Sequence, residues 1–155
     1  MNGGFLLPFQ LKIIFCRVQR KSIEEITITE KEQIIQARVG QGRFRANLLK
    51  DCPFCPITQV SDERLLIASH IKPWKYATNT ERLDYKNGFM LTPTYDRLFD
   101  QGLISFDSNK TMLISPWLKQ MTCQQLGLAE KIFSQLPING RQNYLEFHRH
   151  EIFKM

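Results

Sequence analysis

The stretch from Ser69 to Gly102 constrains this chain more than any other. It contains one histidine, one Asn-Gly pair and two aspartates four residues apart, surrounded by apolar residues and turn formers. Residues 64–69 and 89–92 are short and mainly apolar, which predicts two strands. The Asn-Gly pair at 87–88 predicts a hairpin-type turn before the second of them. The stretch therefore predicts a small unit in which a long polar loop joins two strands.

The end of the same stretch predicts a helix over residues 95–101. Thr94 has a residue type favoured at the N-cap, and Gly102 is a typical C-terminal stop. The apolar residues of this helix point toward the core. Asp96 and Asp100, at positions i and i+4, share the opposite side. The spacing therefore predicts a pair of carboxylates on one side of this helix.

The rest of the chain predicts one compact α+β domain over residues 29–155. An N-terminal extension, residues 1–28, is a strand or the remnant of a longer region. Thr29 and Glu32 have the spacing of a capping box, which predicts a helix that Gly40 and Gly42 end. The other predicted elements are a helix at 43–50, a strand at 57–58 that pairs with 64–69, a β-hairpin of 103–106 and 111–115, and helices at 123–136 and 141–153.

The chain is basic. Its 155 residues carry a formal net charge of +6, which favours polyanionic partners, nucleic acid first. Arg38, Arg43, Arg45 and Lys50 lie close together with no acidic residue among them. They are either a solvated helix face or contacts to DNA phosphates, because arginine presents a planar fork of donors to phosphate oxygens.

The cysteines and the N-terminal residues indicate in which cellular compartment the protein is expected. The four cysteines include a single C-x-x-C pair, Cys52 and Cys55. No second pair completes a tetrahedral site, so the sequence does not favour structural zinc. Buried thiols in a reducing cytoplasm are the expected state. The apolar run near the N-terminus is interrupted by Pro8 and is too short to span a bilayer, so we expect a cytoplasmic protein with no membrane partner.

Four residues of the opening stretch have the chemistry of phosphodiester hydrolysis, which needs an activated water and stabilisation of negative charge. His70 suits proton abstraction at neutral pH. Asp96 or Asp100 can give a hard oxygen ligand to Mg²⁺. Asn87 can hold the loop that carries His70 through its side-chain amide. Each also has an ordinary interpretation, as a structural histidine, a solvated helix face or a simple turn.

Several sequence words resemble, in the same order, those of a large group of bacterial HNH endonucleases, many of the restriction type. From about Thr29 to the C-terminus these words are RVGQGRFRANLL, CPITQ, ASHIKPW, ERLDYKNGFML, YDRLFDQGLISFD and YLEFHRHEIF. The resemblance implies a ββα-metal core (HNH, His-Me finger) with flanking helices and an extra β-hairpin. It implies that His70 is the general base, Asn87 the central asparagine, and Asp96 the replacement for the final histidine. Aspartate suits Mg²⁺ or Mn²⁺.

The chain departs from this family at Ser69, where many relatives have an acidic metal ligand just before the first histidine. The missing ligand is then a water, a substrate oxygen, Asp100 or a residue from elsewhere, with His148 as one candidate. Otherwise His148 and Arg149 contact the scissile phosphate or lie on a helix surface. Together with the basic residues near the site, the predicted nucleic-acid contacts are Arg38, Arg43, Arg45, Lys72, Lys75, His148 and Arg149.

The sequence predicts a divalent-metal-dependent endonuclease that hydrolyses double-stranded DNA in restriction or in defence against foreign DNA. Two alternatives stay open: a DNA-binding module with a degenerate, inactive HNH site, and a nuclease toxin held off by an acidic immunity partner. Cleavage of both strands suggests a homodimer. The sequence does not determine the oligomeric state, the recognition sequence or the role of the N-terminal residues.

Overall fold

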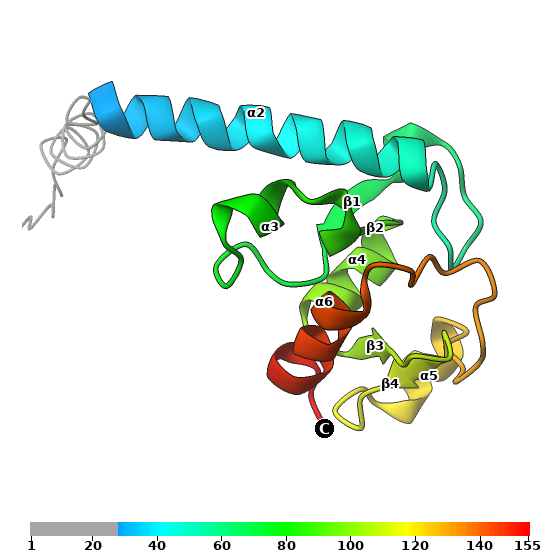
Figure 1. Ribbon diagram of the computed structural model, residues 1–155. Helices are drawn as coiled ribbons and strands as arrows, with labels where there is room; N and C mark the ends of the chain where they lie inside the picture. Colours follow the sequence, from blue (N-terminus) through cyan, green and yellow to red (C-terminus); the bar gives the residue numbers. More distant parts are fainter. Residues whose placement is uncertain (1–27) are drawn as a thin grey trace, which may run out of the picture. The chain divides into compact units, whose positions relative to one another are not determined.

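The computed structural model describes residues 28–155, so the predicted extension and the strand within it lie outside the described residues apart from residue 28. The structure combines helices with two antiparallel pairs of strands, an α+β arrangement. The chain divides between Val39 and Gly40 into two compact units. The elements (Figure 1) are α2 (Ile28–Asp51), β1 (Ile67–His70), α3 (Asn79–Leu83), β2 (Gly88–Leu91), α4 (Pro93–Asp100), β3 (Ile104–Phe106), β4 (Met112–Ile114), α5 (Gln120–Gln125) and α6 (Gln142–Phe147), with 3₁₀ turns at Glu63–Leu65 and Tyr85–Asn87 and a π-helical turn at His148–Ile152.

Helix α2 is continuous, and the predicted break at Gly40 and Gly42 is wrong. A glycine inside a helix costs about 1 kcal/mol relative to alanine but does not prevent helical dihedrals. Gly40 is buried, and a Cβ there would lie 2.9 Å from a side-chain carbon of Leu83. Close packing in the tertiary structure therefore accounts for this glycine. One and two turns later, Phe44 and Leu48 are buried in the core.

Strands β1 and β2 form an antiparallel pair in which Ser69 lies opposite Phe89 and His70 opposite Gly88. Directly opposed residues of such a pair point to the same face of the sheet. The ring of Phe89 packs on that of Phe99 in α4, with 6.0 Å between their centroids. Ser69 therefore faces α4, whereas His70 and Gly88 face the other side, toward α2.

The structure corrects three details around these strands. Residues 57–58 do not pair with 64–69; the partner of β1 is β2, and Cys55 and Val60 instead close a tight turn through a 2.9 Å backbone hydrogen bond. The N-cap of α4 is Thr92 rather than Thr94, because Pro93 takes the first helical position, where its missing N–H costs nothing. The Asn-Gly pair is not a hairpin turn either, since residue 87 ends a 3₁₀ turn and residue 88 begins β2.

Helix α4 lies between the β1–β2 pair and the β3–β4 pair and packs on both (Figure 1). Strands β3 and β4 confirm the predicted hairpin at 103–106 and 111–115. The buried rings of Phe89, Phe99, Phe106 and Phe133 meet here, with centroids 6.0 to 6.3 Å apart. This aromatic cluster holds α4, and with it the two predicted carboxylates, against the strands.

The C-terminal part differs from its prediction in one helix. Helix α5 ends at Gln125, before Gly127 with φ +63°, so the predicted helix at 123–136 is wrong. Helix α6 and the π-helical turn after it agree with the prediction at 141–153. This end of the chain packs against Gly102, which has a φ of +66°. The backbone of Ile152 occupies the place where a Cβ of residue 102 would lie, and the Gly102 carbonyl accepts from the amide of Lys154 at 2.9 Å. Of the helices in residues 28–155, none has the length and apolar character to cross a membrane.

Candidate functional site

His70 ends β1 and lies half-buried between two aromatic rings. The ring of Phe44 stacks on it with 3.9 Å between centroids and 9° between planes, and Trp74 meets it edge-on at 5.7 Å. Its Nε2 lies 3.0 Å from the carbonyl oxygen of Arg82. Because a carbonyl only accepts, Nε2 carries the proton, and Nδ1 of the neutral ring is an acceptor. No hydrogen bond to Nδ1 is found within residues 28–155, so this nitrogen is free to accept a proton.

The surroundings of His70 also favour its neutral form. Burial lowers the pKa of His70 below its ordinary value, and the hydrogen bond to the Arg82 carbonyl opposes part of that shift. A lowered pKa keeps the imidazole unprotonated at neutral pH, as a general base requires. The geometry and the charge state of His70 therefore point the same way.

Asn87 holds the loop that follows His70. Its side chain is fully buried, and its Oδ1 accepts from the amide of Lys72 at 2.8 Å. Its Nδ2 donates to the carbonyl oxygens of Lys72 at 3.2 Å and of Glu81 at 3.0 Å. One amide thus ties both ends of the 72–81 loop to the start of β2. The catalytic role of Asn87 stays a prediction. Its hydrogen bonds in this structure are to the backbone of the loop.

Side chains of the loop reinforce the same closure. Lys72, a predicted DNA contact, instead pairs with Glu81, with its Nζ 2.8 Å from Oε1. This pairing lowers the pKa of Glu81. Arg82 donates from Nε to the carbonyl of Trp74 at 3.1 Å and lies 4.8 Å from the centre of the Trp74 ring. Neither Arg82 nor Glu81 was predicted as a site residue, although Thr78 and Glu81 form a capping box that signals α3.

Asp96 and Asp100 lie in the first and last turns of α4. Burial raises the pKa of Asp100 above its ordinary value, and the negative charge of Asp96 raises it further. The two carboxylates therefore lie close enough to repel each other. Within residues 28–155, no three side chains of His, Cys, Asp or Glu converge as a metal-binding group. Their role as metal ligands stays a prediction.

Ser69 occupies the position where many HNH relatives have an acidic metal ligand, and in this structure its hydroxyl is buried without a partner within residues 28–155. The residue is 3% exposed, and its Oγ is the one buried side-chain N or O atom of the described residues with no hydrogen-bond partner. The strand register points it toward α4. A buried hydroxyl with no partner costs on the order of 1–3 kcal/mol.

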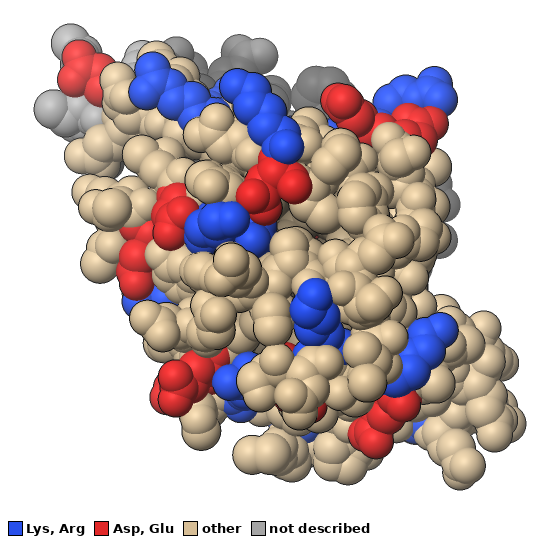
Figure 2. Space-filling view, turned by 45° about the vertical axis from the view of Figure 1, so that its right-hand side comes forward, with Lys and Arg blue, Asp and Glu red and all other residues tan. Residues whose placement is uncertain are grey.

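The predicted basic contacts divide into free and engaged side chains. Arg38, Arg43 and Lys75 are exposed. Arg45 is engaged, because its two terminal nitrogens donate to the carbonyls of Leu66 at 2.8 Å and Glu63 at 2.7 Å. In the face shown by Figure 2, basic and acidic side chains lie next to one another with wide uncharged areas between them. This face of the molecule is thus not a continuous basic surface.

The prediction for His148 is wrong. This residue is 1% exposed, and its ring stacks on Phe99 with 3.8 Å between centroids. Its Nε2 donates to the carbonyl of Phe99 at 3.1 Å, and its Nδ1 accepts from Ser105 Oγ at 2.9 Å. Both ring nitrogens are occupied inside the core, so His148 is a structural histidine. The neighbouring Arg149 is half-buried and donates to the carbonyl of Phe106 at 2.9 Å.

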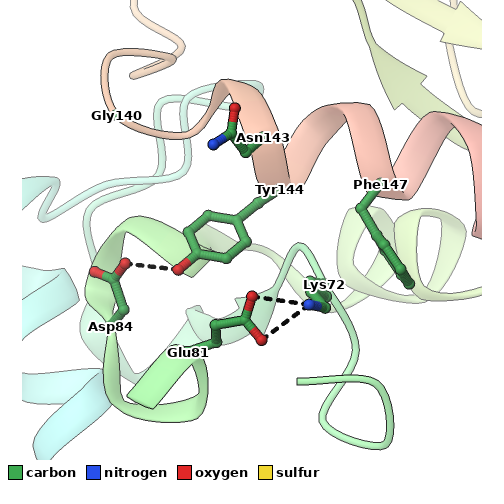
Figure 3. Close-up of a pocket in the computed structure, with 7 residues that line it drawn as sticks. All are labelled: Lys72, Glu81, Asp84, Gly140, Asn143, Tyr144 and Phe147. Atoms are coloured by element: carbon green, nitrogen blue, oxygen red, sulfur yellow. Dashed lines mark hydrogen bonds and ion pairs between the residues drawn. The ribbon is translucent and has the colours of Figure 1, made fainter. Parts of the chain in front are cut away.

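A polar cavity of about 340 Å³ lies beside the loop (Figure 3). Its lining includes Lys72, Glu81, Asp84, Tyr144 and Phe147. Four of these side chains form two pairs, shown by the dashed lines in Figure 3. Tyr144 donates to Asp84 at 2.8 Å, and Lys72 forms an ion pair with Glu81. Burial and the contact with Asp84 raise the pKa of Tyr144. The cavity therefore lies between the loop and α6.

Arg141 is a structural residue with no sequence signal. It is fully buried, and its Nε donates to the carbonyl of Gly88 at 3.0 Å. Its guanidinium also pairs with Asp51 at 2.7 Å, and Asp51 pairs with Lys86 at 3.0 Å. Burial opposes ionisation of Asp51, but these two partners outweigh it and lower its pKa. Arg141 thus holds the end of α2 against the start of β2.

Comparison with known proteins gives one family. Residues 55–107 match the family model described as HNH endonuclease. This region, about a third of the chain, spans β1 to β3 and contains His70, Asn87, Asp96 and Asp100, but not the arginines of α2. A search of curated proteins found no match to the chain. Residues 55–107 are therefore similar to the HNH endonucleases, a family of nucleases.

Proposed function

We propose that this chain is an endonuclease that hydrolyses phosphodiester bonds of double-stranded DNA with the help of Mg²⁺ or Mn²⁺. The observation that carries the proposal is the state of His70. Its Nε2–H is bonded to the Arg82 carbonyl, its Nδ1 is free to accept, and burial lowers its pKa. A neutral, oriented imidazole at the end of a strand is what a general base for water activation requires.

The reaction begins with a water next to Nδ1 of His70. The imidazole takes a proton from this water as the water oxygen attacks the phosphorus of the scissile phosphate. The bond from phosphorus to the leaving oxygen breaks, and the leaving oxygen takes a proton from solvent. The proton stays on Nδ1, and the ring, already protonated at Nε2, becomes an imidazolium. Asn87 keeps the 72–81 loop in place during this step. Arg82, whose carbonyl accepts from Nε2 of His70, follows directly after this loop.

The donors on α4 fit a hard divalent ion. Mg²⁺ accepts one or two protein carboxylates and keeps several waters, so Asp96 and Asp100 suffice as protein ligands. Burial and, after it, the negative charge of Asp96 raise the pKa of Asp100, and a bound cation would offset the effect of that charge. When bound, such an ion neutralises charge on the phosphate and on the leaving oxygen. The exposed Arg43 and Lys75 are the side chains that we assign to the DNA backbone, with Arg38 and the half-buried Arg149 as further contacts.

A plasmid-cleavage assay tests this function. Wild type is incubated with supercoiled DNA in Mg²⁺, Mn²⁺, Ca²⁺ or EDTA, beside His70→Ala and Asp96→Ala. We expect nicking or linearisation in Mg²⁺ or Mn²⁺, none in EDTA, and a loss of at least about 100-fold in His70→Ala. His150→Ala, at an exposed histidine, is the matched control and keeps full activity. Full activity in a folded His70→Ala variant would remove His70 as the base.

The second candidate is a DNA-binding module with an inactive HNH site. The observation that favours it is the serine before His70 together with the absence, within residues 28–155, of three converging metal-binding side chains. This candidate predicts salt-sensitive DNA binding without cleavage in any divalent ion. A metal-dependent nick in the same plasmid assay excludes it. We connect the proposed activity with restriction or defence in the cytoplasm through the sequence resemblance alone.

A further inference from the structure

The closest aromatic contact of the His70 ring is with a residue far away in sequence. Phe44, on α2, lies parallel to the imidazole with 3.9 Å between centroids and 9° between planes. Phe44 is 1% exposed, so its ring has a fixed place in the core. It also lies outside residues 55–107, the region that matches the HNH endonuclease family. The ring that covers one face of His70 is thus supplied by a different part of the chain.

The opposite strand is shaped to admit this ring. Gly88, the cross-strand partner of His70, has no side chain, and a Cβ there would collide with Cζ of Phe44. The same Cβ would lie 3.1 Å from a side-chain carbon of Leu48 and 3.1 Å from the carbonyl of Ser69. The extended backbone of Gly88, with φ −161°, does not itself require glycine. The space taken by Phe44 therefore accounts for glycine at this position.

Three contacts together leave the His70 ring one orientation. The Phe44 face fixes the plane of the ring, and the edge-on Trp74 ring closes a second side. The Nε2–H bond to the Arg82 carbonyl fixes the rotation within that plane. Without the stacked ring, the imidazole can tilt about its side-chain torsions, because one hydrogen bond does not define a plane. A misplacement of about 1 Å in a catalytic group can cost about 100-fold in rate.

We propose that Phe44 is a positioning residue: its ring holds the His70 imidazole in the orientation that directs Nδ1 to the attacking water. The effect on catalysis rests on the proposed nuclease function, whereas the effect on the orientation of His70 does not. Helix α2 then has a second task besides packing. It completes the site from outside the family-matched region by delivering one side chain.

The test compares Phe44→Leu with Leu48→Ala in the full chain. Both changes truncate a buried side chain on the same helix, one turn apart, but only the first removes the ring over His70. Leu48→Ala removes more stability by the usual core values, about 2–5 kcal/mol against about 1 kcal/mol, so it is the stricter control for a general packing defect. Urea denaturation first confirms that both variants are folded.

Nuclear magnetic resonance of the His70 ring gives the readout that is independent of activity. The face of Phe44 shifts the His70 ring protons upfield in the wild type, and the ¹⁵N shifts report a neutral ring protonated at Nε2. We expect Phe44→Leu to abolish the upfield shift and to mix the two tautomers, and Leu48→Ala to retain both features. Wild-type shifts and tautomer in Phe44→Leu would overturn the proposal, whether or not the protein cleaves DNA.

Cleavage kinetics then test the consequence for the reaction. We expect Phe44→Leu to lower kcat about tenfold with KM within twofold, and Leu48→Ala to leave both within twofold. Equal kcat losses in the two variants would overturn the positioning role. If the wild type cleaves nothing in any divalent ion, the nuclease proposal fails, while the resonance comparison still decides whether Phe44 orients His70.

Discussion

The side-chain amide of Asn87 and the backbone of Lys72 form a reciprocal pair of hydrogen bonds. Oδ1 accepts from the Lys72 amide at 2.8 Å, and Nδ2 donates to the Lys72 carbonyl at 3.2 Å. The same Nδ2 reaches the Glu81 carbonyl at 3.0 Å. The side chain of Asn87 therefore supplies the hydrogen bonds that a neighbouring strand would give to the backbone of Lys72. Lys72 lies two residues after His70, the proposed base.

Replacing Asn87 should destabilise the protein. Asn87→Ala leaves one buried N–H and two carbonyls without their partner, which costs about 2–3 kcal/mol of unfolding free energy. Asn87→Asp does not restore it, because an ionised carboxylate cannot donate to the two carbonyls. Urea denaturation measures both variants. The control is Asn143→Ala, at an exposed asparagine, and a midpoint for Asn87→Ala equal to that of this control would contradict the prediction.

His148 should make the protein acid-sensitive. Burial lowers its pKa from 6.5 to about 4, while the unfolded chain keeps the ordinary value. Between these values the unfolded state binds more protons, so stability falls as the pH falls from about 6.5 to about 4. The difference of 2.5 pKa units, at about 1.4 kcal/mol per unit, corresponds to a loss on the order of 3 kcal/mol. Above pH 6.5 both states are neutral and the effect vanishes.

Urea midpoints measured from pH 7 to pH 4 test this linkage. His148→Phe should flatten the slope while leaving the smaller contribution of His70, whose pKa is lowered in the same direction. His150→Ala, at an exposed histidine of the same turn, should keep the wild-type slope. A slope unchanged in His148→Phe would show that the buried ring is not the titrating group.

Arg141 should contribute to stability through its ion pair with Asp51 and its hydrogen bond to the Gly88 carbonyl. Arg141→Met leaves Asp51 without its closest partner and the Gly88 carbonyl without its donor, which costs about 3–5 kcal/mol. The double variant Arg141→Met/Asp51→Asn should recover part of that loss, because it also removes the carboxylate that has lost its closest partner. Guanidinium denaturation measures the cycle. Arg64→Ala, in the exposed pair with Asp62, should leave the midpoint unchanged; strictly additive losses in the cycle would disprove the coupling.

Asp100 should be a site where stability and metal binding conflict. Its raised pKa means that folding disfavours the ionised carboxyl, so stability falls as the pH rises through its titration. Asp100→Asn should therefore raise the Tm in EDTA and reduce the Tm increase that Mg²⁺ produces in the wild type. Glu130→Gln, at an exposed acid, should alter neither value. A full Mg²⁺ effect in Asp100→Asn would remove this residue from the proposed ligand set.

Local pattern was sufficient where an element depends mainly on its own residues. The apolar runs around Asp107 predicted the β3–β4 hairpin, because a short turn brings adjacent segments together. The apolar pair in YDRLFDQ predicted α4 within two residues, since an amphipathic turn with a nearby stop leaves few alternatives. The family match over residues 55–107 confirms the predicted resemblance to HNH endonucleases in this stretch.

Contacts between distant residues decided the remainder. The break predicted at Gly40 was wrong because packing against Leu83 outweighs a propensity cost of about 1 kcal/mol. The surface position predicted for His148 was wrong because Phe99 and Ser105, more than 40 residues away in sequence, accept it into the core. The predicted pairing of residues 57–58 with 64–69 was wrong for the same reason, because β1 pairs with β2, a strand that follows a long loop.

The sequence by itself determined that His70, Asn87 and the α4 aspartates belong to one HNH segment, because these residues and their spacing are local. Only the tertiary structure decided the state of that segment. It showed which nitrogen of His70 is free, that Asn87 closes the loop, that Ser69 is buried without a partner, and that Phe44 covers the imidazole. These properties depend on burial and orientation, which arise only when distant parts of the chain pack together.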